Sequence, residues 1–184
     1  MSIAAAGCSK DTMPKETEAK NTEAEVTEAA ETETQAGATG LFGAFETKTL
    51  EGEAVDQSIF AEADLNMVNI WGTFCGPCIR EMPELGELAA EYEEKGMQLL
   101  GIISDVVEPG DETAMQIVEK TKADYTHLVL SQELWNNYLG SVQAVPTTIF
   151  VDKDGNQVGD IWVGSRSKED WTKIIDEALE QVAP

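Results

Sequence analysis

The sequence predicts an α/β domain in which helices cover both faces of a mixed β-sheet. From Leu41 onward, apolar residues recur with strand and helix periods in the order β-α-β-α-β-α-β-β-α, the pattern of a layered α/β fold. Residues 99–104 are continuously apolar, as in a parallel strand buried on both faces. Residues 147–151 and 158–163 flank Asp152-Lys153-Asp154-Gly155, a turn sequence typical of antiparallel hairpins. The sheet is therefore expected to contain both strand directions.

The domain is expected to open with a β-hairpin and a central strand. Phe45 to Leu50 alternates as a strand does, and Glu51-Gly52-Glu53 supplies a turn. Ala54-Val55 can then return as the partner strand. Met67 to Ile70 follows as the first strand of the central sheet, and it leads to a pair of cysteines.

A long amphipathic helix is expected after Cys78. Apolar residues fall at helical spacing from there on, at Ile79, Met82, Leu85, Leu88, Ala89 and Tyr92. The helix should run to about Lys95, with Gly96 as its cap. Pro83 lies inside it and predicts a kink, because proline removes one backbone hydrogen bond.

The rest of the chain completes the alternating pattern. A loop over residues 105–111 precedes a helix over 112–122, and a strand over 127–130 precedes a short helix over 133–138. Residues 167–182 predict the closing helix, with Ser167 as its N-cap. The roughly 144 residues from Leu41 to the end are enough for one ordinary domain.

The composition excludes several classes of partner. The chain has 184 residues with 35 acidic and 12 basic side chains, a formal net charge of -23. Phosphate binding needs clustered Lys and Arg, so the acidity argues against nucleic acid. It also argues against electrostatic docking on anionic lipid. With 3 Cys residues, the chain is not a disulfide-dense scaffold.

Residues 1–8 resemble the end of a bacterial lipoprotein signal. In such signals small residues precede a cysteine, as Ala5-Ala6-Gly7 precede Cys8 here, and the resemblance implies that Cys8 is lipidated. A lipid there would anchor the protein to the cell membrane without a spanning helix. No Lys or Arg precedes Cys8 and the apolar stretch is short, so the chain is expected to start at an internal Met. The alternative is a chance cysteine near an unstructured end.

Residues 9–40 predict a flexible acidic tether. Thr-Glu-Ala repeats every five residues, at Thr17, Thr22 and Thr27. The segment has no aromatic residue and almost no large aliphatic one, so it cannot bury enough surface to order itself. The domain is expected to follow over residues 41–184.

Cys75 and Cys78 are the candidate reactive groups. Cys75 lies where the strand passes into the helix, and the free N–H groups and dipole of a helix start favour a thiolate. Cys78 lies one turn further on the same face, so the two sulfurs can meet and alternate between dithiol and disulfide. Pro77 suits the first helical turn because it has no N–H to leave unpaired.

Two other interpretations of this pair compete with a redox role. A structural zinc site needs four ligands, and the only further cysteine and histidine are Cys8 and His127. An inert disulfide is possible, but so short a loop gives little entropic stabilisation. The combination of strand, Cys-Gly-Pro-Cys and helix favours a redox pair, with neither metal nor cofactor expected.

Three motifs resemble the TlpA/ResA-like extracytoplasmic branch of the thioredoxin superfamily. They are Trp71-Gly72-Thr73-Phe74-Cys75-Gly76-Pro77-Cys78, Glu81-Met82-Pro83 and Val145-Pro146-Thr147-Thr148-Ile149-Phe150-Val151-Asp152. The resemblance covers roughly Phe45 to the C-terminus and implies a thioredoxin-like fold with an added N-terminal β-hairpin. It implies a protein-disulfide reductase that is reduced in turn by a CcdA/DsbD-like membrane thiol donor. Substrates in this branch include apocytochrome c thiols, and a monomer is expected.

The resemblance also assigns the site residues. Cys75, Cys78 and Glu81 are expected to be catalytic, with Glu81 tuning the thiols and moving protons. A solvated helix glutamate is the alternative for Glu81. Pro146 is expected to be a cis-proline beside the cysteines that exposes the Val145 backbone. From the residues alone, the alternative is a proline at an ordinary strand start. The residues expected to contact a partner protein are Trp71, Phe74, Gly76, Pro77, Val145 and Pro146. The alternative for Trp71 and Phe74 is that they only pack beside the buried strand.

Two further residues bear on these roles. Asn69 stands where thioredoxin has a buried aspartate, and an amide cannot accept a proton, so a relay must use another group such as Glu81. His127 is expected to lie at the edge of the core without a catalytic part.

The expected reaction begins with attack of the Cys75 thiolate on a partner disulfide. Cys78 then attacks the mixed disulfide and releases the reduced partner. A thiol peroxidase of this superfamily would carry the motif Pro-x-x-x-Thr/Ser-x-x-Cys. Here Val68 stands in place of the proline and Gly72 in place of the threonine or serine, so the motif is absent. A copper chaperone would use Cys-x-x-x-Cys with a histidine, and here the cysteine spacing differs.

Overall fold

A five-stranded mixed sheet forms the centre of the computed structural model, which describes residues 40–183. Its strand order is β5-β4-β3-β6-β7. The central strand β3 (Leu65–Trp71) runs parallel to β4 (Met97–Ile103), and β4 runs parallel to β5 (Thr126–Val129). On the other side β6 (Thr147–Asp152) is antiparallel to both β3 and β7 (Gln157–Val163). The predicted mixture of strand directions is confirmed.

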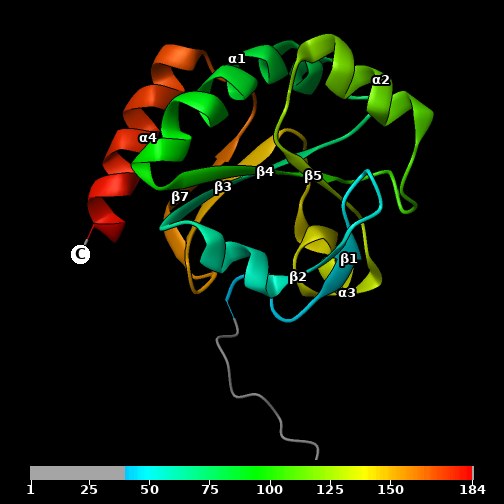
Figure 1. Ribbon diagram of the computed structural model, residues 1–184, viewed down its shortest axis with the longest axis horizontal. Coiled ribbons are helices and arrows are strands. Elements are labelled where there is room, and N and C mark those ends of the chain that lie inside the picture. The colour runs from blue at the N-terminus through cyan, green and yellow to red at the C-terminus, as the bar shows by residue number, and fades with distance from the viewer. Residues whose placement is uncertain (1–39, 184) are drawn as a thin grey trace, which may run out of the picture. The chain divides into compact units, whose positions relative to one another are not determined.

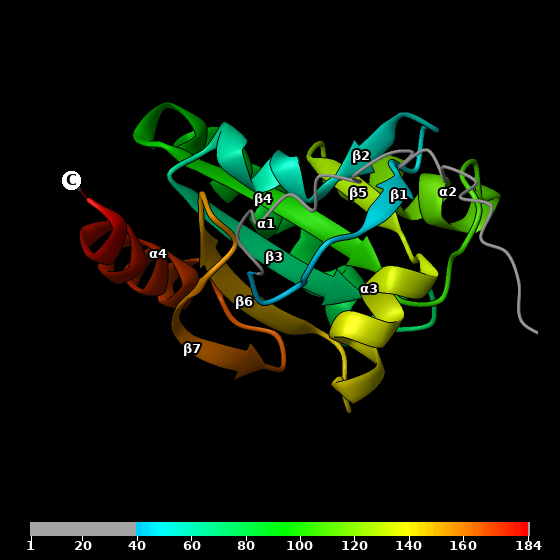
Figure 2. The same cartoon turned by 90° about the horizontal axis from the view of Figure 1, so that it is seen from below.

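Helices lie on both faces of this sheet, as predicted. In Figure 1 the helices α1 (Gly76–Tyr92) and α2 (Glu112–Thr121) lie above the sheet, and α3 (Gln132–Asn137) lies below it. Helix α4 (Lys168–Val182) lies at the left of the view and packs with α1 and the same face of β3. Figure 2 shows α3 near the end of β3 at which the chain turns toward α1. Short 3₁₀ helices follow α1 and α3, over Glu93–Lys95 and Leu139–Ser141.

The predicted N-terminal hairpin is present and adds to the edge of the sheet. Strands β1 (Glu46–Lys48) and β2 (Ala54–Asp56) pair antiparallel, and Thr49 forms a bridge with Leu128 of β5. The hairpin therefore covers the strand edge that β5 would otherwise expose. A 3₁₀ helix over Gln57–Glu62, capped by the Asp56 side chain, was not predicted.

The two faces of β3 contribute to separate apolar clusters. Val68 and Ile70 pack with residues of α3 and the N-terminal segment, and Met67 packs with residues of α1 and α4. All seven residues of β3 are buried, because the strand has a neighbour on each edge and helices on each face. The strand begins two residues before, and ends one residue after, the predicted range of Met67 to Ile70.

Helix α1 begins at Gly76, before Cys78 rather than after it. Cys75 is its N-cap, and Pro77 occupies the first turn, as predicted. Gly96 adopts the left-handed conformation with φ 87° and ends the 3₁₀ turn that follows the helix. Pro83 lies within the helix as expected, and the kink there stays a prediction.

Gly86 provides a test of how closely α1 packs on the segment after α2. A Cβ at this position would lie 2.4 Å from the Lys122 backbone oxygen. Gly→Ala inside a helix usually stabilises by about 0.5–1 kcal/mol. We predict the opposite sign for Gly86→Ala, a loss of about 1–3 kcal/mol, because backbone atoms must separate.

Urea unfolding of Gly86→Ala and of Ala90→Gly, at an exposed position on the same helix, would measure this difference. Nothing crowds an exposed helical site, so Ala90→Gly should follow helix propensity alone and lose about 0.5–1 kcal/mol. Alanine is thus expected to be the better residue at position 90 and the worse one at position 86. If Gly86→Ala were more stable than the parent protein, the close approach of α1 to the Lys122 backbone would be contradicted.

None of the helices within residues 40–183 is both long enough and apolar enough to cross a membrane. The expected lipid anchor at Cys8 and the tether over residues 9–39 lie outside the described residues.

Candidate active site

Cys75 lies at the junction of β3 and α1, as predicted. Its backbone is extended, with φ -88° and ψ 95°, and its sulfur accepts a hydrogen bond of 3.2 Å from the N–H of Cys78. The sulfur therefore acts as the N-cap of the helix and lies beside its unpaired N–H groups. Such a position stabilises negative charge on the sulfur in the reduced protein.

Cys75 and Cys78 are joined by a disulfide. Their Cα atoms are 5.3 Å apart, so the pair closes without displacement of the helix. Cys78 is fully buried and Cys75 is 5% exposed. Cys75 is therefore the sulfur that an incoming group can reach first.

The segment before β6 lies against Cys75. The Val145–Pro146 bond is cis, as the resemblance implies, and the Val145 oxygen lies 3.5 Å from the Cys75 sulfur. Gly164, after β7, donates its N–H to the Pro146 oxygen at 2.8 Å. Residues about 70 positions apart in the sequence thus meet at one site.

The residues expected to contact a partner protein differ in exposure. Phe74 is 72% exposed, Gly76 and Pro77 are exposed, and Val145 is half-buried. Trp71 is fully buried, and its indole donates a 3.2 Å hydrogen bond to His127 Nδ1. Pro146 is buried as well. Trp71 thus lies beneath the surface and supports the site from the core, because its strand is covered on both faces.

The loop before Cys75 is anchored by Asp105, a residue that sequence analysis missed. Asp105 accepts hydrogen bonds from the Thr73 backbone N–H at 3.0 Å and from the Thr73 hydroxyl at 2.5 Å. Asp105 follows β4, and the ends of parallel neighbours meet at one edge of a sheet. The sequence did contain a signal for this contact, because Asp105 is an acidic residue two positions after the end of β4, the parallel neighbour of β3.

Glu81 lies three residues after Cys78 on α1 and is buried, so it is not a solvated helix residue. It is 4% exposed, and its carboxylate accepts hydrogen bonds from Asn69 Nδ2 at 3.3 Å and from the Arg166 N–H at 3.1 Å. Asn69 Nδ2 also donates to the Thr148 hydroxyl at 2.9 Å. Strands β3 and β6, helix α1 and the loop after β7 therefore converge on this carboxyl.

The pKa of Glu81 is raised above its ordinary value. Burial is the main cause, since it disfavours the charged form. The Arg166 N–H, the Asn69 amide, the Trp171 indole and the Arg166 charge oppose this effect. Burial thus makes this carboxyl a weaker acid, and its carboxylate a stronger base, than an exposed glutamate.

His127 lies in the core, and both of its ring nitrogens are engaged. Nδ1 accepts from Trp71, and Nε2 lies 3.1 Å from the Ala123 oxygen, to which it donates. It therefore offers no free atom to a metal ion, as a copper site would need. Within residues 40–183, no group of three or more His, Cys, Asp or Glu side chains is placed to hold a metal.

Burial lowers the pKa of His127 from 6.5 to about 4. The folded protein then binds fewer protons than the unfolded chain between these values, so stability is lost as pH falls from 6.5 toward 4. The hydrogen bond to Ala123 and the charge of Glu51 oppose the shift. We predict that this residue removes about 2 kcal/mol of stability between about pH 7.5 and pH 5.

Urea unfolding of the parent protein and of His127→Gln at both pH values isolates this contribution, because all other groups are shared. The parent should lose more stability than the variant on acidification. If the parent protein and His127→Gln lost equal amounts of stability on acidification, the lowered pKa of His127 would be contradicted.

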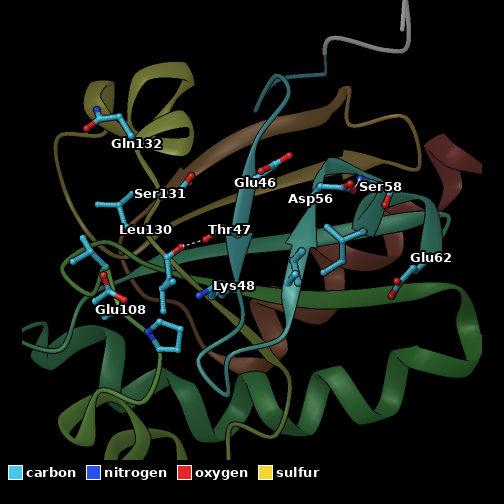
Figure 3. Close-up of a pocket in the computed structure, with 16 residues that line it drawn as sticks. Glu46, Thr47, Lys48, Asp56, Ser58, Glu62, Glu108, Leu130, Ser131 and Gln132 are labelled. Atoms are coloured by element: carbon cyan, nitrogen blue, oxygen red, sulfur yellow. Dashed lines mark hydrogen bonds between the residues drawn. The ribbon is translucent and has the colours of Figure 1, made fainter. Parts of the chain in front are cut away.

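A groove of about 840 Å³ lies apart from the cysteines, between the hairpin and the loops after β4 and β5 (Figure 3). Four acidic residues and Lys48 contribute to its lining; the acids are Glu46, Asp56, Glu62 and Glu108. The hydroxyl of Thr47 donates to the Val129 oxygen and joins the two walls. Neither Cys75 nor Cys78 lines this groove.

The fold and the cysteine pair together define a thiol–disulfide oxidoreductase with a thioredoxin-like fold. The Redoxin family matches residues 11–177, and the chain belongs to this family. Within it the chain is TlpA/ResA-like. The thiol-disulfide oxidoreductase ResA of Bacillus cereus (strain ZK / E33L) is 29% identical over 141 residues, which cover 76% of this chain and 69% of that protein.

Another relative and a solved structure agree with this assignment. ResA of Geobacillus thermodenitrificans is 34% identical over 117 residues, which cover 64% of this chain and 62% of that protein. The structure of a thioredoxin-family thiol:disulfide interchange protein from Chlorobium tepidum matches with a TM-score of 0.62 and 25% identity. It covers 74% of this chain and 93% of the other.

Proposed function

We propose that this protein reduces disulfides in other proteins outside the cytoplasm, with Cys75 as nucleophile and Cys78 as resolving thiol. The observation that carries the proposal is the capping contact between the Cys75 sulfur and the Cys78 N–H at the start of α1. A helix start stabilises a thiolate, and the thiolate is the form that attacks a disulfide. The burial of Cys78 beneath Cys75 supports the order of the two attacks.

The reaction proceeds through a mixed disulfide. The Cys75 thiolate attacks one sulfur of the partner disulfide, and the other partner sulfur leaves as a thiolate and takes a proton. Cys78 loses its proton and attacks Cys75. The Cys75–Cys78 bond forms, the bond to the partner breaks, and the reduced partner departs. An external dithiol must then restore the reduced protein.

Glu81 is proposed as the group that accepts the Cys78 proton. Glu81 lies three residues after Cys78 on α1, so the two side chains share a face of the helix, and both are buried. Water has poor access to a thiol in this position. A buried carboxylate with a raised pKa is a suitable local base.

The partner is proposed to bind across Cys75 between Phe74 and the segment of Val145 and Pro146. Phe74 offers an exposed aromatic face, and aromatic residues are frequent anchors in protein interfaces. The Val145 backbone next to Cys75 can pair with an extended substrate segment. Gly76 and Pro77 complete the exposed surface beside the sulfur.

The location and substrates are also part of the proposal. Residues 1–8 would carry the lipid on Cys8, residues 9–40 would form the acidic tether, and residues 41–184 would be the catalytic domain. The TlpA/ResA-like motifs support a place outside the cytoplasm, reduction by a CcdA/DsbD-like membrane donor and a role such as cytochrome c maturation.

Reduction of insulin disulfides tests the proposed direction of reaction. The reduced protein, supplied with dithiothreitol, should accelerate insulin precipitation well above dithiothreitol alone. Peroxide consumption under the same conditions should stay near the background rate. Fast peroxide turnover that depends on Cys75, without insulin reduction, would contradict the proposal and favour a thiol peroxidase.

A further inference from the structure

Residues 72–75 form a tight turn between β3 and α1. The Cys75 N–H donates to the Gly72 oxygen at 3.0 Å, so Thr73 and Phe74 occupy the two central positions of the turn. Phe74 is 72% exposed and immediately precedes Cys75, so the turn presents an aromatic side chain next to the reactive sulfur. One internal hydrogen bond fixes such a short turn only weakly, so its conformation depends on contacts from outside it.

Asp105 supplies such a contact with its side chain. Its Oδ1 accepts a hydrogen bond of 3.0 Å from the Thr73 backbone N–H, and its Oδ2 accepts one of 2.5 Å from the Thr73 hydroxyl. Hydrogen bonds to a carboxylate are stronger than those between neutral groups. A single carboxylate thus holds both the backbone and the side chain of one central turn residue. Both contacts depend on the residue at position 105, because its backbone takes no part in them.

The residues on either side of Asp105 are fixed to the sheet. The Ser104 N–H donates to the Trp71 oxygen at 2.8 Å, at the end of β3. Val106 is 6% exposed and packs in the apolar cluster that contains both cysteines, and its oxygen accepts from the Leu130 N–H at 2.7 Å. The Asp105 carboxylate is therefore a fixed point against which the turn is held, although Asp105 itself is exposed.

The conformation of this turn determines where Phe74 points. The Phe74 ring lies over Gly72, where an added Cβ would be 2.7 Å from Cε1 of the ring. Thr73 lies between these two residues, so rotation of its backbone would carry the ring away from Gly72. The two hydrogen bonds to Asp105 oppose that rotation. An aromatic side chain that is already held in place loses less conformational entropy when a partner binds.

We propose that Asp105 is a positioning residue for partner recognition: through Thr73 it fixes the turn that presents Phe74 to a protein bound across Cys75. The inference rests on the proposed contact between Phe74 and the partner, and it adds the residue that controls this contact. The partner that benefits carries an apolar side chain close to its disulfide, on which the Phe74 ring can pack. A small disulfide without such a side chain should react equally well with and without Asp105.

Single-turnover oxidation of the reduced protein by insulin tests the proposal. The reaction is stopped with acid at successive times, and the oxidised fraction is read from the mass added by a maleimide, in proteins that also carry Cys8→Ser. For Asp105→Ala the half-saturating insulin concentration should rise about three- to tenfold, as expected when one more side chain must be ordered on binding. The maximal rate should change by less than about twofold, because the sulfurs are untouched.

Three comparisons identify the contact that is responsible. Asp105→Asn keeps an oxygen for the Thr73 N–H and gains an amide that can donate to the Thr73 hydroxyl oxygen, so it should remain within about twofold of the parent. Glu108→Ala removes an exposed charge from the same loop and should not change oxidation by insulin. Bis(2-hydroxyethyl) disulfide offers nothing on which Phe74 can pack, so it should oxidise the parent and Asp105→Ala at the same rate.

A double-mutant cycle tests whether Asp105 acts through Phe74. Phe74→Ala should itself raise the half-saturating insulin concentration, and in that background Asp105→Ala should have no further effect. Exchange of the Thr73 amide proton, followed by NMR, reports the contact directly. It should be slow in the parent and in Asp105→Asn, and at least about tenfold faster in Asp105→Ala. Urea unfolding of each variant establishes that the fold is retained.

The outcomes separate the inference from the function on which it rests. A reduced parent protein that insulin does not oxidise would contradict the proposed function itself. If Phe74→Ala leaves the half-saturating concentration unchanged, the proposed contact of Phe74 is wrong, and the role of Asp105 fails with it. If Phe74→Ala raises that concentration but Asp105→Ala does not, only the inference about Asp105 is wrong. The same holds if Asp105→Ala keeps its full effect in the Phe74→Ala background, or slows the small disulfide equally.

Discussion

Cys75→Ser is expected to abolish insulin reduction, with a loss of at least about a thousandfold that leaves the uncatalysed rate. The hydroxyl of serine does not ionise near neutral pH, so the helix start has no thiolate to stabilise. The variant should fold normally, because Cys75 lies at the rim of the core. Cys8→Ser, outside the domain, is the matched control and should retain full activity.

Cys78→Ser should give a different result from Cys75→Ser. Without a resolving thiol, the mixed disulfide between Cys75 and the partner cannot be released. Non-reducing electrophoresis should therefore show protein–partner adducts that dithiothreitol removes. If adducts instead accumulated in Cys75→Ser, the roles of the two cysteines would be reversed.

Gly101→Ala is expected to cause the largest loss of stability of any single methyl group added to the sheet, about 2–4 kcal/mol. Gly101 lies in β4 between Asn69 and His127. A Cβ there would lie 2.3 Å from His127 Nδ1 and 3.0 Å from Trp71 Nε1. The added atom would therefore break the hydrogen bond by which Trp71 is held beneath the site.

A double-mutant cycle tests this explanation. In a His127→Ala background the nearest obstacle is absent, so Gly101→Ala should cost at least about 1 kcal/mol less than it does in the parent protein. Chemical denaturation of the four proteins supplies the coupling energy. Equal losses in both backgrounds would show that the methyl group does not meet His127.

The strands and helices were predictable because local patterns match their environments. The continuous run at 99–104 became a buried parallel strand, and the turn at Asp152–Gly155 joins β6 to β7. The 3₁₀ helix over Gln57–Glu62 was missed because its two buried residues, Ile59 and Phe60, show no helical period.

The candidate site was predictable only where a local motif marked it. Cys75, Cys78 and the cis-proline stand in recognisable stretches, and Glu81 is one helical turn from Cys78. Asp105 and Arg166 act through contacts with Thr73 and Glu81 that lie 32 and 85 positions away. Such contacts depend on how the sheet and loops assemble, and no short pattern encodes them. Trp71 was expected to contact a partner, with packing as the alternative, and the sequence does not show that both faces of its strand are covered.

The most direct measurement of the central claim is the rate of alkylation of Cys75 by iodoacetamide in the reduced protein, followed from acidic to alkaline pH. Mass spectrometry of the digested protein assigns the label to each cysteine. The position of Cys75 at the N-cap predicts a pKa clearly below the value of about 8.5 for a free thiol, with Cys78 reacting much more slowly. If both thiols titrated at or above that value, the helix start would not activate Cys75, and the proposed mechanism would be wrong.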